Sequence, residues 1–529
     1  MTDAAPGAPR QRSWPAWMVA ASLAVLGSLV VLGLAVSGGN VVVGLVPLLG
    51  VALAVALWKL PLRLPALLIF FLTIFLEGPF ERPAQGLWET PLFFLAKLLL
   101  TNLNTTTGIK PLAFTAIDLL VAGMLLVMIV RGPRLDQGRQ PTARPVRLWA
   151  VVSLGTCLFL WLFGLARGGN FTNSLWQIHK IIYLSLLVLL FSATLQGKKD
   201  HQIITWMLLG AALYKAALAI YVRLTVDNGG VPLATATSHD DSILFANACL
   251  LPLIAYAEKP DRRRALVLLT LPLILGGMLA NGRRIVWVEV VVCLLMLYIL
   301  SPRSPLKRKL SRILIVMLPL VPLYVVMGWN SSATIFKPLR TLQSVSSPDA
   351  DRSTMTRDIE NFNLIWTLKE NVLLGTGFGH EYQEKVVADD ISLAFPQYRY
   401  IPHNGVLGLW AFTGLLGFTG LWMILALGVF FAARSYRFAA DHEDRTIAFW
   451  CISSIAIFLV QAYGDMGTQS WMGPSTAAMA VAMAGKLAVA MGAWPRARLA
   501  AAAPGQPDTK PASEPPRLTL VTRDGGADR

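Results

Sequence analysis

Residues 16–36 read AWMVAASLAVLGSLVVLGLAV, an apolar run that contains no charged side chain. About 20 residues of this kind are needed for a helix to cross the hydrocarbon core of a bilayer. The whole chain of 529 residues is 55% hydrophobic and 14% charged, whereas soluble domains carry roughly 25% charged residues. A soluble protein with many buried helices would not need an uncharged run of this length. The sequence therefore predicts a membrane protein.

Similar apolar runs follow along almost the whole chain. Because lipid offers no partner to backbone polar groups, such runs cross a membrane as helices. We predict an all-α, polytopic transmembrane bundle of about 12–14 spans. The run at 91–100 is shorter and is expected to lie at the membrane interface. The candidate spans are residues 16–36, 40–57, 64–77, 111–130, 148–166, 175–195, 202–222, 242–257, 265–280, 284–301, 312–328, 404–433, 447–463 and 472–492.

Lys and Arg gather in alternate turns between these spans, for example at 262–264 and 307–309. By the positive-inside rule these turns face the cytoplasm, which places both termini there as well. The net charge of +16 is then mainly an orientation signal. Nucleic acid is not an expected partner, because binding it needs a soluble basic face. All four cysteines fall within candidate spans, so the sequence predicts neither a disulfide framework nor a zinc cluster.

The longest polar segment covers residues 329–403, on the non-cytoplasmic side of this topology. Loops in compact membrane proteins are short, and a long one is more often functional. We expect short helices within it. The predicted organisation is N-terminal spans at 1–147, core spans at 148–328, the large periplasmic loop at 329–403, closing spans at 404–492 and a disordered cytoplasmic tail at 493–529.

Residues 351–382 within this loop predict a helix followed by a glycine-rich stop. Arg352 and Arg357 stand near the start of that helix. A guanidinium fork and helix N-terminal N–H groups both suit a phosphate. The alternative is that the two arginines pair with nearby acids on a solvated face. The apolar positions at helical spacing are Ile359, Phe362, Leu364, Ile365 and Leu368, and the breaking glycines are Gly375, Gly377 and Gly379.

A second unusual stretch is LANGRRIVWVEVV, residues 279–291. Arg283 and Arg284 stand at the outer mouth of a span, against the positive-inside trend. An arginine at such a position is costly unless it is paired or used. The alternative is snorkelling to lipid headgroups, but two adjacent outward arginines favour a diphosphate site.

His403 closes the long loop and Asn404 opens the next span. Histidine can accept a proton near neutral pH, which makes His403 a candidate base for a sugar hydroxyl. Asn404 is also a good helix cap, and His403 can alternatively be an interfacial residue satisfied by a headgroup or a carbonyl. Gly414, Gly417 and Gly420 follow at every third residue, a pattern that permits close helix packing and a bend.

Three of these segments, in this order, match a known pattern. HNGVLGLWAFTGLLG (403–417) resembles the H-N-x-x-L signature with two later glycines that follows the periplasmic loop of the O-antigen ligase and O-antigen polymerase superfamily. NFNLIWTLKENVLLGTGFGHEY (361–382) resembles that family's short helix and glycine turn, with Asn371 where proline is common. GRRIVWVEV (282–290) is similar to its arginine-bearing span start. The resemblance covers roughly residues 150–470.

The resemblance implies an inverting, metal-independent glycosyltransferase without a cofactor, located in the bacterial inner membrane. Its donor would be an undecaprenyl-diphosphate-linked glycan on the periplasmic side. Many relatives place an arginine in the stretch that corresponds to residues 174–184, where this chain has Lys180. The implied roles are diphosphate binding by Arg283 and Arg284 with Arg352, Arg357 and Lys180, acceptor activation by His403 with Asn404, and a second candidate base in His380.

Within the superfamily, a polymerase extends O-antigen or exopolysaccharide repeat units, whereas a ligase passes the glycan to lipid A core or protein. The polymerase is favoured here by the wide N-terminal part and by the missing arginine. A lipid-linked sugar transporter or flippase is a third alternative, which predicts buried charges such as Lys215 and Glu289. Expected partners are the lipid-linked donor, a glycan or lipid A core acceptor and membrane lipids, with a flippase and a chain-length regulator as candidates.

Overall fold

The computed structural model describes residues 16–36, 38–39, 41–76, 91–103, 114–131, 140–226, 235–301, 305–331, 336, 339, 352–388, 390–393, 395–465 and 467–495. Most of these residues are helical, and no named strand occurs among them. Seven of the described helices are long and apolar enough to cross a membrane, and the bent pair Ser311–Met317 and Leu320–Gly328 meets the same criterion together. The predicted all-α polytopic bundle is therefore confirmed. The predicted tail beyond residue 495 lies outside the described residues.

Each candidate span coincides with a helix or with a broken run of helices. The predicted interfacial run at 91–100 is also helical. In the N-terminal half the helices are α1 (Ala16–Val36), α2 (Val41–Lys59), α3 (Arg63–Phe75), α4 (Pro91–Leu100), α6 (Ala116–Arg131), α7 (Arg144–Ala166), α8 (Phe171–Thr194), α9 (Lys198–Val226) and α10 (Asp241–Glu258). They continue with α11 (Arg262–Val267), η3 (Leu268–Thr270), α12 (Leu271–Asn281), α13 (Ile285–Leu300), α14 (Pro305–Met317), α15 (Leu320–Gly328), α17 (Arg352–Glu370), α18 (Gly405–Phe438), α19 (His442–Gly464) and α20 (Met472–Ala490).

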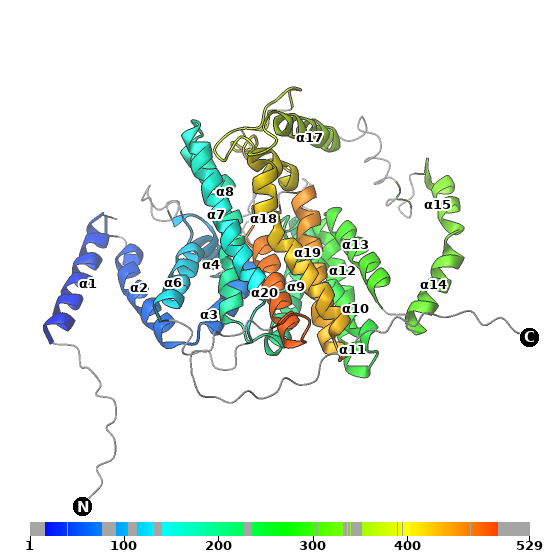
Figure 1. Cartoon of the computed structure of the whole chain (residues 1–529), viewed down its shortest axis with the longest axis horizontal. Helices are drawn as coiled ribbons and strands as arrows, with labels where there is room; N and C mark the ends of the chain where they lie inside the picture. The colour runs from blue at the N-terminus through cyan, green and yellow to red at the C-terminus, as the bar shows by residue number, and fades with distance from the viewer. Residues whose placement is uncertain are drawn as a thin grey trace, which may run out of the picture.

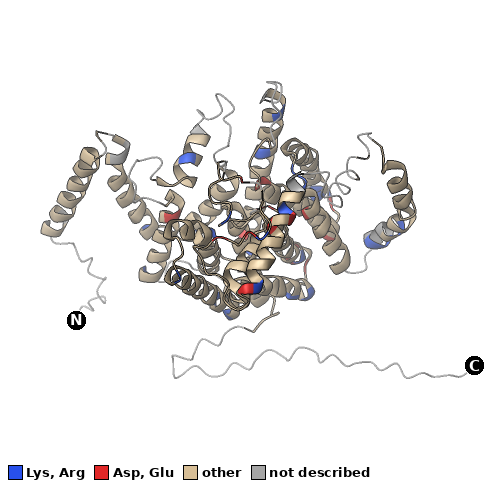
Figure 2. Ribbon diagram, turned by 90° about the horizontal axis from the view of Figure 1, so that it is seen from above, with Lys and Arg blue, Asp and Glu red and all other residues tan. Residues whose placement is uncertain are grey.

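The centre of the bundle is formed by α7, α8, α18, α19 and α20, with α10 packed against α19. Figure 1 shows α1 and α2 at one side of this centre and α14 and α15 at the other. The helix α20 is buried along its whole length and is rich in alanine and glycine. Small residues let neighbouring helices approach closely where lipid gives no hydrophobic driving force between them. Figure 2 shows that charged residues are sparse along the helices.

The helix α17 lies at one end of the bundle, which we call the loop end (Figure 1). It packs against α18. Leu364 is buried in this contact and Leu368 is half-buried beside it, whereas Phe362 and Ile365 are exposed. The apolar positions predicted from the sequence thus divide between two faces, one packed on the bundle and one turned outward.

The helix α18 is broken at Gly414, which has the non-helical angles φ 59° and ψ −166°. The break separates the next two backbone N–H groups from their helical acceptors. The N–H of Leu415 instead donates to the carbonyl of Val372 (2.8 Å), and that of Leu416 donates to the carbonyl of Leu373 (3.0 Å). The bend predicted from the glycine spacing is therefore present, and the loop segment after α17 completes it.

The same segment also satisfies carbonyl groups on the other side of the break. The carbonyl of Ala411 accepts from the N–H of Thr376 (3.3 Å), and that of Phe412 accepts from Gly377 (2.8 Å). A Cβ atom on Gly375 would lie 2.3 Å from the backbone of Phe412, and the φ of Gly375 is +66°. Glycine is required there because the backbones touch and the left-handed conformation excludes larger residues. The loop and α18 are thus joined by backbone hydrogen bonds.

Candidate functional site

His403 lies at the loop end, directly before α18, and faces α17. Its Nδ1 atom is 3.3 Å from the carboxylate of Glu360. Both oxygens of that carboxylate also accept the backbone N–H of His403 at 3.1 Å. Glu360 is buried, whereas the His403 side chain is 25% exposed. A carboxylate that holds one ring nitrogen fixes the orientation of the imidazole and leaves the other nitrogen to act as the base.

Asn404 is the N-cap of α18. Its side-chain oxygen accepts the N–H of Leu407 at 3.1 Å, and its amide nitrogen donates to Asn361 at 3.0 Å. The cap predicted as the structural alternative is therefore observed. Because Asn361 belongs to α17, Asn404 also fastens the start of α18 to the helix that carries Glu360.

Asp465, directly after α19, gathers positive and titratable groups from three other parts of the chain. Its carboxylate lies 2.9 Å from Nη2 of Arg283 and 3.8 Å from Nη2 of Arg357. It also lies 3.6 Å from Nδ1 of His239. Asp465 is 8% exposed, whereas the side chains of Arg357 and His239 are 41% and 48% exposed. The arrangement presents cationic groups at the loop end around one buried acid.

The helix α17 brings this cationic cluster to His403. Arg357 and Glu360 are three residues apart on α17, so they lie on the same side of the helix. Arg357 reaches the cluster around Asp465, and Glu360 holds His403. One turn of α17 therefore contacts both Asp465 and His403, which are far apart in the sequence.

The connection between α19 and α20 links the same groups from the other side. A Cβ atom on Gly405 would lie 2.8 Å from the hydroxyl of Thr468, so Thr468 packs against the start of α18. Trp471 ends the connection, and the amine of Lys180 lies 3.7 Å above its ring. The amine also lies 3.2 Å from Nδ1 of His179. Lys180 is thus held beside the connection that begins at Asp465.

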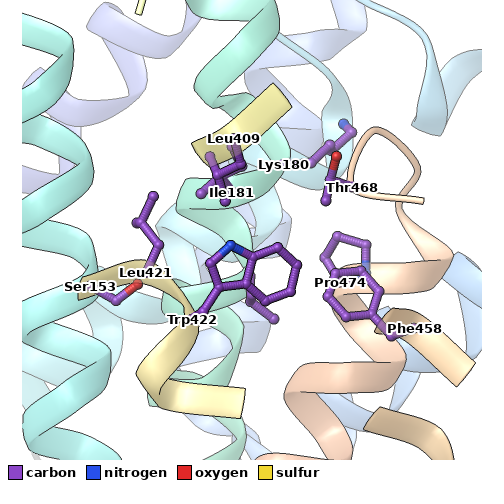
Figure 3. Close-up of a pocket in the computed structure, with 10 residues that line it drawn as sticks. Ser153, Lys180, Ile181, Leu409, Leu421, Trp422, Phe458, Thr468 and Pro474 are labelled. Carbon is purple, nitrogen blue, oxygen red and sulfur yellow. The ribbon is translucent and has the colours of Figure 1, made fainter. Parts of the chain in front are cut away.

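Lys180 and Thr468 also line a small cavity of about 20 Å³ between α7, α8, α18, α19 and α20. Figure 3 shows the amine of Lys180 and the hydroxyl of Thr468 together at one end of it. The remaining walls are mainly apolar. The other lining residues are Ser153, Ile181, Leu184, Leu409, Leu421, Trp422, Phe458 and Pro474.

His380 is held by α7. Its Nε2 atom lies 3.0 Å from the carbonyl of Gly164, and its backbone carbonyl accepts from Gln177 at 3.2 Å. Gln177 also accepts the N–H of Gly379 at 2.5 Å and donates to the carbonyl of Tyr400 at 2.9 Å. These contacts attach the glycine turn to α7 and α8, so His380 and His403 have different surroundings.

The two remaining predicted arginines take less defined positions. Arg284 immediately precedes α13 and is exposed. Arg352 is the first residue of α17, and its side chain lies outside the part that the structure describes. Of the predicted diphosphate-binding arginines, Arg283 and Arg357 lie against Asp465.

Further acidic side chains lie next to this cluster. Burial raises the pKa of Asp240 to about 7, and the neighbouring carboxylates of Asp465 and Asp241 contribute to the rise. Lys215 forms a 2.5 Å ion pair with Asp241, and both are fully buried between α9 and α10. Glu289 is fully buried in α13. In the described residues, no group of three or more His, Cys, Asp or Glu side chains is placed to hold a metal ion.

The sequence did not indicate Glu360, Asp465 or His239 as site residues. Each of these residues contacts a partner that is far away in the chain. Residue spacing along one helix cannot predict such a contact. Asp465 left one usable signal, because it is an acid at the end of a long apolar span, where charge is costly unless it is paired.

Residues 268–422 match a family model described as O-antigen ligase. The matched segment runs from η3 into α18 and includes Arg283, Arg357, Glu360 and His403. It confirms the resemblance that the arginine, loop and histidine motifs predicted. No curated protein matches the chain. The match supports membrane glycan processing of the O-antigen ligase and polymerase type, in a multi-pass membrane protein.

Proposed function

We propose, from the O-antigen ligase match of residues 268–422, that this protein is a membrane glycosyltransferase acting on an undecaprenyl-diphosphate-linked oligosaccharide. The reaction polymerises repeat units of O-antigen or exopolysaccharide. It takes place at the loop end, which faces the periplasm when both termini are cytoplasmic and the bundle lies in the bacterial inner membrane. The observation that carries the proposal is the pairing of Arg357 with the Asp465 cluster and of Glu360 with His403 on one face of α17.

The cationic cluster is suited to the leaving group. Arg283 is held by Asp465 at 2.9 Å and so cannot swing freely into solvent. Positive groups fixed in advance stabilise the negative charge that develops on a departing diphosphate. Arg357 is more exposed and can turn toward the same group. Lys180 adds an amine donor at one end of the apolar cavity.

His403 is suited to activate the acceptor. The acceptor hydroxyl gives its proton to the ring nitrogen that faces away from Glu360, and its oxygen attacks the anomeric carbon of the donor. The bond between that carbon and the diphosphate oxygen breaks, and its electron pair leaves with the diphosphate. Attack opposite the leaving group inverts the anomeric configuration. Glu360 stabilises the imidazolium that forms.

The direct test is transfer by the full-length protein reconstituted in liposomes with a polyprenyl-diphosphate-linked oligosaccharide. A polyprenyl-monophosphate-linked oligosaccharide serves as the comparison donor. We expect transfer from the diphosphate donor and little from the monophosphate, and we expect Arg283→Ala to lose about 100-fold or more. Arg437→Ala, at the opposite end of α18, is the matched control and should transfer normally. Equal use of both donors, or full activity of Arg283→Ala, would contradict the proposal.

The ligase reaction is the second candidate, favoured by the description of the matched family. Glycan chain lengths in a deletion strain distinguish the two. Single unpolymerised repeats indicate the polymerase, and free polymer that is not transferred indicates the ligase. Activity that persists in a metal chelator is expected for either, and a requirement for a divalent metal would reject the metal-independent mechanism.

A further inference from the structure

The segment between α17 and the glycine turn carries exposed apolar side chains. Val372 is 53% exposed and Leu373 is 69% exposed. No Asp, Glu, Lys or Arg occurs between Glu370 and Glu381. An exposed apolar turn of this kind would be unfavourable in a loop surrounded by water, since transfer of such side chains out of water lowers the free energy.

The position of this turn along the bundle is fixed by its hydrogen bonds to α18. The carbonyls of Val372 and Leu373 accept from Leu415 and Leu416, which follow the break at Gly414 and lie about three turns into α18. Those two residues are themselves 50% and 56% exposed. Exposed leucines on a membrane-spanning helix face lipid, so the turn adjoins a lipid-facing surface.

Contacts with α7 show how deep Leu415 and Leu416 lie below the polar end of the bundle. A Cβ atom on Gly417 would lie 2.3 Å from Leu160, and Leu160 is seven residues before Arg167. At a rise of about 1.5 Å per residue, this level lies roughly 10 Å below Arg167. The intervening residues of α7 are all apolar or glycine. Val372 and Leu373 are bonded to Leu415 and Leu416, which directly precede Gly417. The turn therefore lies at the depth of the hydrocarbon core of the membrane.

The backbone of the segment tolerates that environment. Irregular backbone is found at membrane depth only where its polar groups are satisfied by protein. The carbonyls of Val372 and Leu373 are bonded to α18, and the N–H of Gly375 donates to the carbonyl of Asn371 at 2.8 Å. The break at Gly414 supplies the partners that the loop would otherwise lack.

We infer that the turn formed by residues 371–374 dips into the lipid leaflet on the loop-end side, where Val372 and Leu373 contact acyl chains. The loop after α17 is thus a shallow re-entrant segment instead of a wholly aqueous one. Lipid contact then anchors the end of the helix that carries Arg357 and Glu360. This inference rests on the membrane-spanning fold and does not require the proposed glycan reaction.

The test is site-directed spin labelling of the full-length protein in lipid nanodiscs. A nitroxide is attached to Leu373→Cys and, separately, to Val372→Cys, since the four native cysteines are all buried. Collision rates are measured with oxygen, which concentrates in lipid, and with a water-soluble nickel chelate. Leu416→Cys is the lipid-facing reference. Val387→Cys, at a loop position that is 81% exposed, is the aqueous reference.

We expect the labels at 372 and 373 to collide with oxygen more than with the chelate, as at 416, with the opposite ratio at 387. A chelate-dominated ratio at both turn positions would overturn the inference and place the turn in water. Low collision rates with both reagents would also overturn it, because another protein surface would then cover the turn. Using two labelled positions keeps the test decisive if one variant fails to fold.

Discussion

Arg357 and Glu360 lie three residues apart on α17, where the first reaches the carboxylate of Asp465 and the second holds the ring of His403. One helix of the long loop thereby sets the spacing between a cationic cluster and a candidate base. Each of the predictions below tests one part of this arrangement or of its support.

Glu360→Gln should lower kcat for glycan transfer by about 100-fold, with little change in the KM of the donor. The amide keeps the shape of the side chain but cannot stabilise a charged imidazolium. Steady-state transfer assays in liposomes measure both constants. Glu370→Gln is the matched control, since this acid lies on the same helix but contacts Trp366 and Gln383. A rise in donor KM at unchanged kcat would argue that Glu360 acts in binding.

Arg357→Lys should retain more activity than Arg283→Lys. Arg357 lies 3.8 Å from Asp465 and is 41% exposed, so another point charge can replace it. Arg283 lies 2.9 Å from Asp465 and is 19% exposed, so its ion pair is closer and less open to solvent. We expect losses of about 3-fold for Arg357→Lys and about 30-fold for Arg283→Lys, because an exposed ion pair contributes less than a shielded one. Transfer assays on both variants, normalised to the amount of folded protein, make the comparison. Equal losses would show that the two arginines do not differ in this way.

The stability of the protein should fall as the pH rises from about 4 to about 7. Burial and neighbouring carboxylates raise the pKa of Asp240 from 3.8 to about 7. The folded state therefore keeps a proton that the unfolded state has already released, and stability decreases with pH between the two pKa values. Asp240→Asn should flatten this part of a thermal-unfolding profile in detergent and raise the melting temperature at pH 8. Asp358→Asn, which changes an exposed acid of α17, is the control, and an unchanged slope in Asp240→Asn would contradict the assignment.

Gly375→Ala should destabilise the protein by about 1–3 kcal/mol. Gly375 has a left-handed conformation, and an added Cβ would lie 2.3 Å from the backbone of Phe412. This clash would push the loop away from the break in α18. Gly210→Ala is the matched control, since a Cβ there meets nothing within 4 Å and alanine favours a helix. Thermal unfolding monitored by circular dichroism gives the comparison. Equal melting temperatures for the two variants would show that the junction is not rigid.

Local patterns in the sequence predicted most of the fold. Every apolar run assigned as a span is helical, the loop helix begins at Arg352, and the glycines after it have positive φ. These features depend on residues that are close together in the chain, since helix periodicity and glycine breaks are local properties. Gly414 was predicted to permit a bend. The hydrogen bonds that complete this bend run from α18 to the carbonyls of Val372 and Leu373, and spacing along the chain cannot predict a contact between two such distant segments.

The candidate site was predicted only in part. Arg283 and His403 were identified because an arginine at a span mouth or a histidine at a span start is unusual. Arg357 was identified because a guanidinium near the start of a loop helix suits a phosphate. Their partners were not, because Glu360 and Asp465 become informative only when the fold brings them within hydrogen-bond distance. Arg283 and Arg284 looked equivalent in the sequence, and only the structure distinguishes the half-buried Arg283 from the exposed Arg284.

The most direct measurement is single-turnover transfer from a polyprenyl-diphosphate-linked oligosaccharide by His403→Ala in liposomes, beside wild type and His442→Ala. His442 begins α19 at the end opposite to Asp465, so its variant controls for the loss of an imidazole. We predict a loss of about 10²- to 10⁴-fold for His403→Ala, normal insertion of both variants and wild-type transfer by His442→Ala. Wild-type transfer by His403→Ala would contradict the role of His403 as the base.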